Sequence, residues 1–197
     1  SVLPADGGWR FTATMGLEAI KTWAPDGSVQ VWDRDIPTAQ LALLDLAGDG
    51  RPDLVPLAGD LTVQPDWTGA PTEGLELAPL DEDTRYRDAS LIDVDGDGQT
   101  ELLLSLWDGD WGGLELWRRD GEGWAFGERI GAGQGGVGQA FDHLLVDLTG
   151  DHVPDIYACN DHGPDFGANR LLANDGAGGF SDATPEGADL SMSCMSA

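Results

Sequence analysis

Three acidic segments recur along the chain at nearly constant spacing. They read DLAGDGRPD from residue 45, DVDGDGQTE from residue 93 and DLTGDHVPD from residue 147. Each segment carries a carboxylate at its first, fifth and ninth positions and has apolar residues on both sides. Calcium prefers six to eight oxygen ligands at about 2.3–2.6 Å, and a tight glycine-containing loop can turn alternate side chains toward one ion. The segments are therefore typical of calcium-binding loops between strands, repeated along the chain.

An Asp-Gly turn motif keeps the same register as the acidic segments. The turns start at residues 26, 120 and 175, and a weaker Glu-Gly copy starts at residue 73. Successive turns are 47, 47 and 55 residues apart, and each acidic segment precedes its turn by 28, 27 or 28 residues. An Asp-Gly pair between alternating apolar residues predicts a β-hairpin. Two independent motifs in one register indicate a structural repeat of about 50 residues.

Each repeat predicts four strands, since one strand enters the acidic loop, one leaves it, and the hairpin adds two more. The strands predicted to flank the loops are residues 41–44 and 54–57, 91–92 and 102–106, and 144–146 and 156–159. Four strands in about 50 residues is the size of a propeller blade. The chain is therefore predicted to be all-β, a β-propeller or a large part of one, with units at residues 1–44, 45–92, 93–146 and 147–197.

The charge balance argues against some partners. The sequence has 36 acidic and 10 basic residues, a formal net charge of −26, so nucleic acid and insertion into an anionic membrane are not expected. The 29 glycines favour a turn-rich β protein, and the 8 tryptophans argue against intrinsic disorder. The chain starts at Ser1 without an apolar signal core, and we expect a secreted or periplasmic protein whose signal peptide has been removed.

The acidic loops resemble the FG-GAP and VCBS repeats of integrin-α-like β-propellers, whose pattern is close to D-x-D-x-D-G-x-x-D-L. Residues 169–184, NRLLANDGAGGFSDAT, resemble the N-x-L-x-x-N-x-G-x-G-x-F-x-D-x-T stretch of secreted bacterial members. The resemblance covers most of residues 20–185. It implies calcium-stabilised blades and is unspecific for function, since such propellers serve as adhesion modules, carbohydrate-active enzymes and accessory domains.

The resemblance implies calcium ligands at positions 1, 3, 5 and 9 of each loop, together with the backbone carbonyl of position 7. The implied ligands are Asp45, Asp49, Arg51 and Asp53 in the first loop, Asp93, Asp95, Asp97, Gln99 and Glu101 in the second, and Asp147, Thr149, Asp151, Val153 and Asp155 in the third. Only the second loop has the full acidic set, because Ala47 and Thr149 occupy position 3 of the other two. We expect the first site to bind calcium more weakly.

The resemblance also implies a ring of seven or eight blades, more than the four hairpin units of this chain. The repeat register places a further acidic loop before Ser1 and another after Ala197. An open ring exposes sheet edges that pair readily with other chains. We therefore expect a second copy of the chain or a separate propeller fragment to complete the ring, and the alternative is a self-closed four-bladed propeller.

Two alternatives to structural calcium stay open. Paired carboxylates can serve glycoside hydrolysis, although three copies in register favour repeated structure over a single active site. Thiolate, thioether and imidazole ligands suit copper, especially Cu(I). The candidate soft-metal ligands are His143, His152, His162, Cys159, Met192, Cys194 and Met195. A Cys159–Cys194 disulfide, or plain burial of these cysteine and methionine side chains, would instead make them structural.

The sequence favours a secreted, calcium-stabilised interaction module that binds a protein or a carbohydrate. Trp67, Trp107 and Trp111 lie at predicted loops or strand ends, where an aromatic ring can stack on a sugar or fill a gap between blades. The rival classes are a metalloenzyme with a copper-type or carboxylate site on the propeller face, and a purely structural blade array. The sequence carries no nucleophile elbow, phosphate loop, zinc pair or dinucleotide motif, and it does not decide whether the chain is an enzyme.

Overall fold

The fold is known from a computed structural model, which describes residues 2–5, 8–15, 19–33, 40–57, 61–67, 75–77, 85–107, 112–121, 123–130, 139–161 and 167–190. These residues form sixteen strands and no helix. The chain divides into two compact units, Ser1–Thr84 and Arg85–Ala197, and each is described by itself. The prediction of an all-β chain is confirmed.

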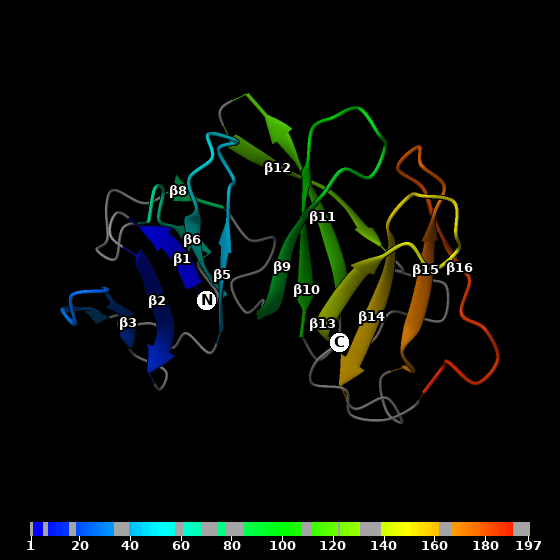
Figure 1. Cartoon of the computed structure of the whole chain (residues 1–197). Coiled ribbons are helices and arrows are strands. Elements are labelled where there is room, and N and C mark those ends of the chain that lie inside the picture. Colours follow the sequence, from blue (N-terminus) through cyan, green and yellow to red (C-terminus); the bar gives the residue numbers. More distant parts are fainter. Residues whose placement is uncertain are drawn as a thin grey trace. The chain divides into compact units, whose positions relative to one another are not determined.

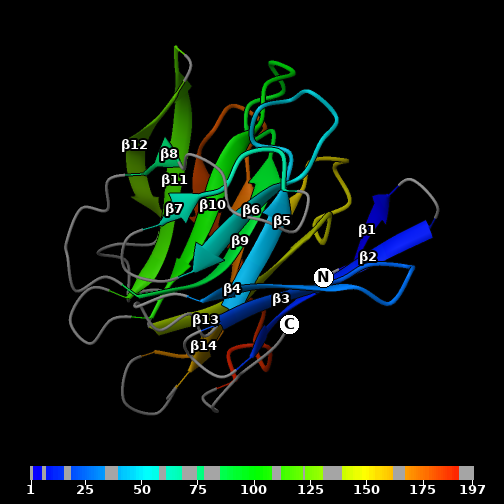
Figure 2. The same ribbon diagram turned by 90° about the vertical axis from the view of Figure 1, so that its left-hand side faces the viewer.

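The first unit holds one continuous sheet and one interrupted sheet. The continuous sheet has the order β1-β2-β3-β4, with β1 at Val2–Ala5, β2 at Gly8–Met15, β3 at Ala19–Trp23 and β4 at Val29–Asp33. The other consists of two pairs, β5 (Gln40–Leu44) with β6 (Asp53–Leu57) and β7 (Thr62–Val63) with β8 (Leu75–Glu76). A bridge between Leu54 and Gln64 joins the two pairs, so residues 40–76 follow the same strand order in a weaker form. Figure 2 shows β5 and β6 side by side.

The second unit holds two continuous four-stranded sheets. One has the order β12-β11-β10-β9, with β9 at Tyr86–Ile92, β10 at Glu101–Leu106, β11 at Gly113–Asp120 and β12 at Gly123–Ile130. The other has the order β13-β14-β15-β16, with β13 at Gln139–Val146, β14 at Asp155–Asp161, β15 at Arg170–Asn174 and β16 at Phe180–Asp182. All neighbouring strands are antiparallel and follow the chain order. This meander of four strands is the topology of a propeller blade (Figure 1).

The predicted hairpins and loops fall where the sequence placed them. The Asp-Gly turns at residues 26, 120 and 175 join β3 to β4, β11 to β12 and β15 to β16. The acidic loops join β5 to β6, β9 to β10 and β13 to β14, so each loop lies between the first and second strands of its sheet. The Glu-Gly copy at residue 73 lies outside the described residues.

The first sheet has no acidic loop between its strands. The repeat register places its acidic loop before Ser1, but all four strands of this sheet lie within residues 2–33. Residues 6–7 alone separate β1 from β2, and they leave no room for a nine-residue loop. This sheet therefore has the strand order of the others without their loop.

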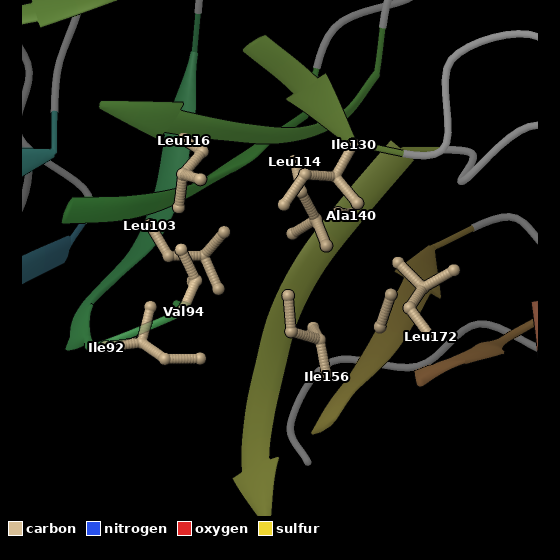
Figure 3. Packing of buried hydrophobic residues seen from close by; sticks show 10 residues of the cluster. Ile92, Val94, Leu103, Leu114, Leu116, Ile130, Ala140, Ile156 and Leu172 are labelled. Atoms are coloured by element: carbon tan, nitrogen blue, oxygen red, sulfur yellow. The ribbon is translucent and has the colours of Figure 1, made fainter. Parts of the chain in front are cut away.

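A core of buried side chains lies between the two sheets of the second unit. Its buried members come from both sheets and from one loop: Ile92, Leu103, Leu114, Leu116 and Ile130 from one sheet, Val94 from the loop between β9 and β10, and Ala140, Ile156, Ala158 and Leu172 from the other sheet. Figure 3 shows these side chains facing one another between the strands. Full burial of one leucine contributes about 1.5–3 kcal/mol, so face-to-face packing holds these two blades together. Every position of β10 is buried, including the polar Glu101 and Ser105, which indicates that the strand is covered on both faces.

Candidate metal centre

Each acidic loop reverses the chain through two residues in the left-handed backbone region. In the second loop these are Gly96 and Gly98, with φ of 73° and 85°. The third loop has Gly150 at φ 83° and His152 at φ 72°, so a histidine stands where the other loops have their second glycine. Only glycine adopts this region without a steric penalty. The His152 backbone is therefore strained relative to its counterparts.

The first carboxylate of each loop accepts hydrogen bonds from the loop's own backbone. In the second loop Asp93 Oδ1 accepts from the Gly96 N–H at 2.8 Å and Asp93 Oδ2 accepts from the Gly98 N–H at 3.0 Å. Asp45 and Asp147 accept from the equivalent amides of their loops. The fifth-position carboxylates also accept the N–H two residues later in all three loops. One frame of hydrogen bonds thus shapes all three loops, whatever stands at position 3.

The ninth-position carboxylates accept hydrogen bonds from backbone amides near the start of their loops. Asp155 Oδ2 accepts from Leu148 N at 2.8 Å and from Thr149 N at 2.9 Å, and its Oδ1 accepts from Asn174 N at 3.1 Å. Asp53 makes the same pattern in the first loop, where its third donor is Asp66 N. The side chain of Glu101 accepts from Val94 N at 3.0 Å. All three are buried, so these residues, which the sequence predicts as ligands, also brace the loop backbone.

The carboxylates at positions 1, 3 and 5 converge in the second loop. Asp93, Asp95 and Asp97 each offer one oxygen, and these oxygens lie within 4.8 Å of one another. Among the described residues this is the one group of three or more acidic, histidine or cysteine side chains that meets this distance. Ala47 and Thr149 break the equivalent set in the other loops. The structure thus brings together three of the predicted second-loop ligands.

The convergence has an electrostatic consequence for Glu101. Burial raises the pKa of the Glu101 carboxyl, and the charges of Asp95 and Asp97 raise it further. The guanidinium of Arg118 opposes this rise. Burial likewise raises the pKa of Asp53, and the charge of Asp45 adds to the rise. A hard divalent cation among these oxygens would relieve the mutual repulsion.

Asp155 differs from the other two ninth-position carboxyls. Burial alone would raise its pKa, but hydrogen bonds from Asn174, Leu148 and Thr149 outweigh burial and lower it. In that loop the ninth position is charged and fully hydrogen-bonded, and position 3 supplies a hydroxyl. The third loop therefore has a stable frame and a poorer cation site than the second.

The donor set of the second loop fits calcium. Three carboxylates on alternate residues of a tight loop are hard oxygen ligands, which calcium prefers over nitrogen or sulfur. Calcium also accepts irregular geometry and a higher coordination number than magnesium, so an irregular nine-residue loop suits it better.

A hairpin turn from the next sheet lies against this loop. The amide of Gly178 donates to the carbonyl of Val94 at 3.2 Å. A Cβ added to Gly178 would lie 3.7 Å from the Cβ of Asp95. On the other side of the turn, a Cβ added to Gly176 would lie 3.3 Å from Val153 of the third loop. The turn at residues 175–179 therefore contacts the second and third acidic loops.

The predicted soft-metal residues do not form a cluster among the described residues. Cys159 is buried and forms a disulfide, so it offers no thiolate. His152 is almost fully exposed, and its Nδ1 lies 3.7 Å from Asp147 Oδ2. The remaining candidates, His162, Met192, Cys194 and Met195, lie outside the described residues.

His143, the seventh of these candidates, lies in a polar contact that sequence reasoning missed. Its buried Nδ1 is 2.8 Å from Ser105 Oγ and 3.2 Å from Asp88 Oδ2. A serine, a histidine and an aspartate in contact suggest a catalytic triad, but a triad needs the serine and the aspartate on opposite ring nitrogens. Here both contact Nδ1, and Nε2 has no hydrogen-bond partner. The arrangement cannot activate Ser105 as a nucleophile.

The tryptophans at the predicted sugar-binding positions have structural contacts. Trp67 is buried in a core cluster with Ile20 and Leu54. Trp107 donates from Nε1 to Asp161 Oδ2 at 3.2 Å, and the Arg87 guanidinium lies 4.7 Å from the centre of its ring. Trp111 lies outside the described residues. Trp67 and Trp107 therefore serve packing and the contact between sheets.

Comparison with known families supports the repeat. Residues 93–158 match the model of the FG-GAP-like repeat. The matched segment starts at the first aspartate of the second acidic loop, covers β10 to β13 and ends within β14 after the third loop. No curated protein matches the chain. No helix among the described residues is long and apolar enough to cross a membrane.

Proposed function

From the FG-GAP-like repeat at residues 93–158, we propose that the protein is a calcium-stabilised β-propeller module that binds a protein or a carbohydrate. The observation that carries the calcium part is the convergence of Asp93, Asp95 and Asp97 on one point of the second loop. The blade topology of the sheets supports the interaction role, because propellers present loops at both ends of a rigid scaffold.

The chain's own residues define what the ion does. Asp93, Asp95 and Asp97 would hold it, and calcium when bound supplies positive charge that offsets their repulsion. The Val94 carbonyl already bonds the turn at residues 175–179 of the neighbouring sheet. Ordering the second loop therefore also steadies the contact between two blades. Ligands that are close together only in the folded chain make calcium affinity a contribution to folding stability.

An oxidising, calcium-rich compartment suits this module, and we propose that it is secreted or periplasmic. Cys159 forms a disulfide, and disulfides persist outside the cytosol. Calcium outside cells is plentiful enough to fill sites of modest affinity. A formal net charge of −26 keeps the surface soluble and favours neutral or basic ligands over nucleic acid.

A binding experiment in two calcium conditions tests the function. The purified chain is applied to glycan and extracellular-protein arrays with calcium and, separately, with EDTA. We expect a ligand that binds in calcium and is lost or weakened in EDTA, because the second loop orders the adjoining blade. The matched variant Asp95→Asn should bind as the wild-type protein does in EDTA. If the wild-type protein and Asp95→Asn bind the ligand equally well in calcium and in EDTA, ligand binding does not depend on calcium.

We also propose that a second copy of the chain or another propeller fragment completes the ring. Four sheets with blade topology are fewer than the seven or eight blades that the resemblance implies. Light scattering of the purified chain measures this directly. A particle of about twice 20.8 kDa would support a second copy. A stable monomer with native near-ultraviolet dichroism would contradict pairing and favour closure of four blades.

A further inference from the structure

The β13–β16 sheet has a second face, opposite the one that packs in the core of the second unit. On β14, Ile156 and Ala158 belong to that core. Side chains alternate between the two faces of a strand, so Tyr157 and Cys159 lie on the opposite face. We call this opposite face the outer face of the sheet.

The outer face repeats the residue positions with which the preceding sheet builds the core. Counted along the repeat, the corresponding pairs are Leu103 and Tyr157, Ser105 and Cys159, and Leu116 and Leu171. The strand pairing agrees with this count, since Leu103 lies opposite Leu116 and Tyr157 lies opposite Leu171. Leu103 and Leu116 pack against the blade that follows them. The outer face therefore has the pattern of a face that receives a further blade.

The seam between the two sheets of the second unit shows which residue would meet Cys159. Across this seam, Ser105 Oγ lies 2.8 Å from Nδ1 of His143, on the first strand of the following sheet. Cys159 stands in the position of Ser105 and forms a disulfide. The one other cysteine of the sequence is Cys194. Cys194 is thus the counterpart of His143 on the first strand of a further blade.

The chain that follows β16 passes over the outer face. It is the red trace after β16 in Figure 1. Next to β16, Leu171 N donates to Thr184 Oγ1 at 2.9 Å. Further along, the Tyr157 hydroxyl donates from the outer face to the Ala188 carbonyl at 3.4 Å. Residues 184–188 therefore lead from the edge strand β16 back to β14.

Two residues later the chain lies close to Cys159. Asn169 N donates to the Leu190 carbonyl at 3.2 Å, and Asn169 Oδ1 accepts from Asn160 N at 2.9 Å. Asn160 is the residue after Cys159. Cys194 follows Leu190 by four residues, which span up to about 14 Å when extended. The described contacts therefore bring the chain within reach of the Cys159 sulfur.

The outer face is covered at one point and exposed at another. Cys159 is fully buried, whereas Leu144, which lies opposite Tyr157 on the same face, is 43% exposed. We propose that residues 191–197, which lie outside the described residues, are the first strand of a further blade. This strand docks on the outer face and is fastened there by a disulfide between Cys159 and Cys194.

The docked strand specifies how a partner would join the chain. A first strand without the rest of its sheet has an unpaired edge, and such edges accept a strand from another chain. The fragment or second copy that completes the ring would therefore add its strands beside residues 191–197. This consequence rests on the proposed completion of the ring, whereas the docking itself depends on neither ring completion nor calcium.

The repeat also predicts which side chains of the docked strand face the sheet. Counted from Cys194, Met192 corresponds to Phe141 and Met195 to Leu144. Phe141 faces the preceding sheet, where the Arg87 guanidinium lies 5.5 Å from the centre of its ring. Leu144 is exposed. We therefore expect Met192 to lie against the outer face and Met195 to face solvent.

Peptide mapping without reducing agent tests the disulfide. The purified chain is digested, and linked peptides are identified by mass spectrometry. We expect one linked pair that contains Cys159 and Cys194, from protein that runs as a single chain on a non-reducing gel. Free thiols would overturn the proposal. A covalent particle of about twice 20.8 kDa, with the disulfide between two copies, would overturn it equally.

Oxidation by hydrogen peroxide tests the docking in the wild-type protein. The formation of sulfoxide at Met192 and Met195 is followed by mass spectrometry, in calcium and in EDTA, with urea-unfolded protein as the control. We expect Met192 to oxidise several-fold more slowly than Met195 in the folded protein and at the same rate in urea, because oxidation follows exposure. The double variant Cys159→Ser with Cys194→Ser should lose most of this difference.

Equal oxidation rates of the two methionines in the folded wild-type protein would overturn the docking. The two calcium conditions separate this result from the calcium proposal. Slow oxidation of Met192 in both conditions would support the docking even if the second acidic loop binds no calcium.

Discussion

The acidic loops at residues 45–53 and 93–101 have the same backbone frame and different capacity for a cation. Both have glycines in the left-handed region at positions 4 and 6, and both use positions 1, 5 and 9 to accept backbone hydrogens. They differ at position 3, where one has Ala47 and the other has Asp95. The comparison shows that the shape of the loop and its ability to hold an ion are specified by different residues.

The largest expected effect comes from removing a buried brace. Asp155→Ala takes away the acceptor of three backbone amides in the third loop. Each buried donor left without a partner costs about 1–3 kcal/mol, so we expect a loss of about 3–5 kcal/mol whether or not calcium is present. Urea unfolding in EDTA and in calcium measures it. Asp151 is an exposed acid of the same loop, and Asp151→Ala should lose well under half as much stability. Equal losses of stability in the two variants would show that Asp155 braces the loop no more than Asp151 does.

Removing the position-3 carboxylate of the second loop should affect the response to calcium and leave the frame intact. The wild-type chain should gain about 2.7 kcal/mol of stability when calcium is at a hundred times its dissociation constant. We expect Asp95→Asn to lose most of this gain, because one charged ligand is gone. Thermal melting with calcium, magnesium and EDTA provides the measurement. Melting temperatures that do not respond to calcium in the wild-type protein would show that the second loop is not a calcium site.

Adding the missing carboxylate to the first loop tests the comparison in the opposite direction. Ala47 is exposed, so Ala47→Asp fits without a clash and places three acids at positions 1, 3 and 5. We expect calorimetry to detect additional calcium binding relative to the wild-type chain. Ala183→Asp, which adds the same charge at an exposed position outside the loops, should leave the stoichiometry unchanged. If both variants behave alike, net charge and not loop geometry controls binding.

The smallest effect concerns the strained turn of the third loop. His152 has a φ of 72° and an exposed side chain, so His152→Gly relieves strain and loses little packing. A left-handed residue costs about 1–2 kcal/mol, and the extra flexibility of glycine in the unfolded chain returns part of it. We expect a net gain of about 0.5–1 kcal/mol by urea unfolding. The reverse change in the second loop, Gly98→His, should lose a similar amount, and a gain there would contradict the strain argument.

Much of the fold was readable from the sequence because its signals are local. Asp-Gly turns and glycine-containing acidic loops specify backbone direction within a few residues, and each predicted strand beside an acidic loop is present in the structure. The first sheet shows the limit of the repeat register, since its first two strands are joined without an acidic loop. A repeat register predicts where a loop can be, and only the strand pairing shows that β1 and β2 connect without it.

The candidate site was only partly predictable. Alternating acids in the second loop pointed to Asp93, Asp95 and Asp97, whose convergence the structure describes. The bracing contacts of Asp53 and Asp155 were not foreseen, because a sequence does not show whether a carboxylate faces an ion or a backbone amide. The contacts of His143 with Ser105 and Asp88 were not foreseen either, because they join strands that are far apart in the sequence.

The sequence by itself determined the strands, the turns and the acid-bearing loops of this protein, since these follow from hydrophobic alternation and from residues that favour a particular backbone angle. Tertiary structure alone decided which groups lie together across the seam between sheets. Ser105 meets His143, and Val94 meets Gly178, over separations of 38 and 84 residues. Such contacts depend on how one sheet packs on the next, and packing changes the chemistry of a carboxyl through burial and neighbouring charge.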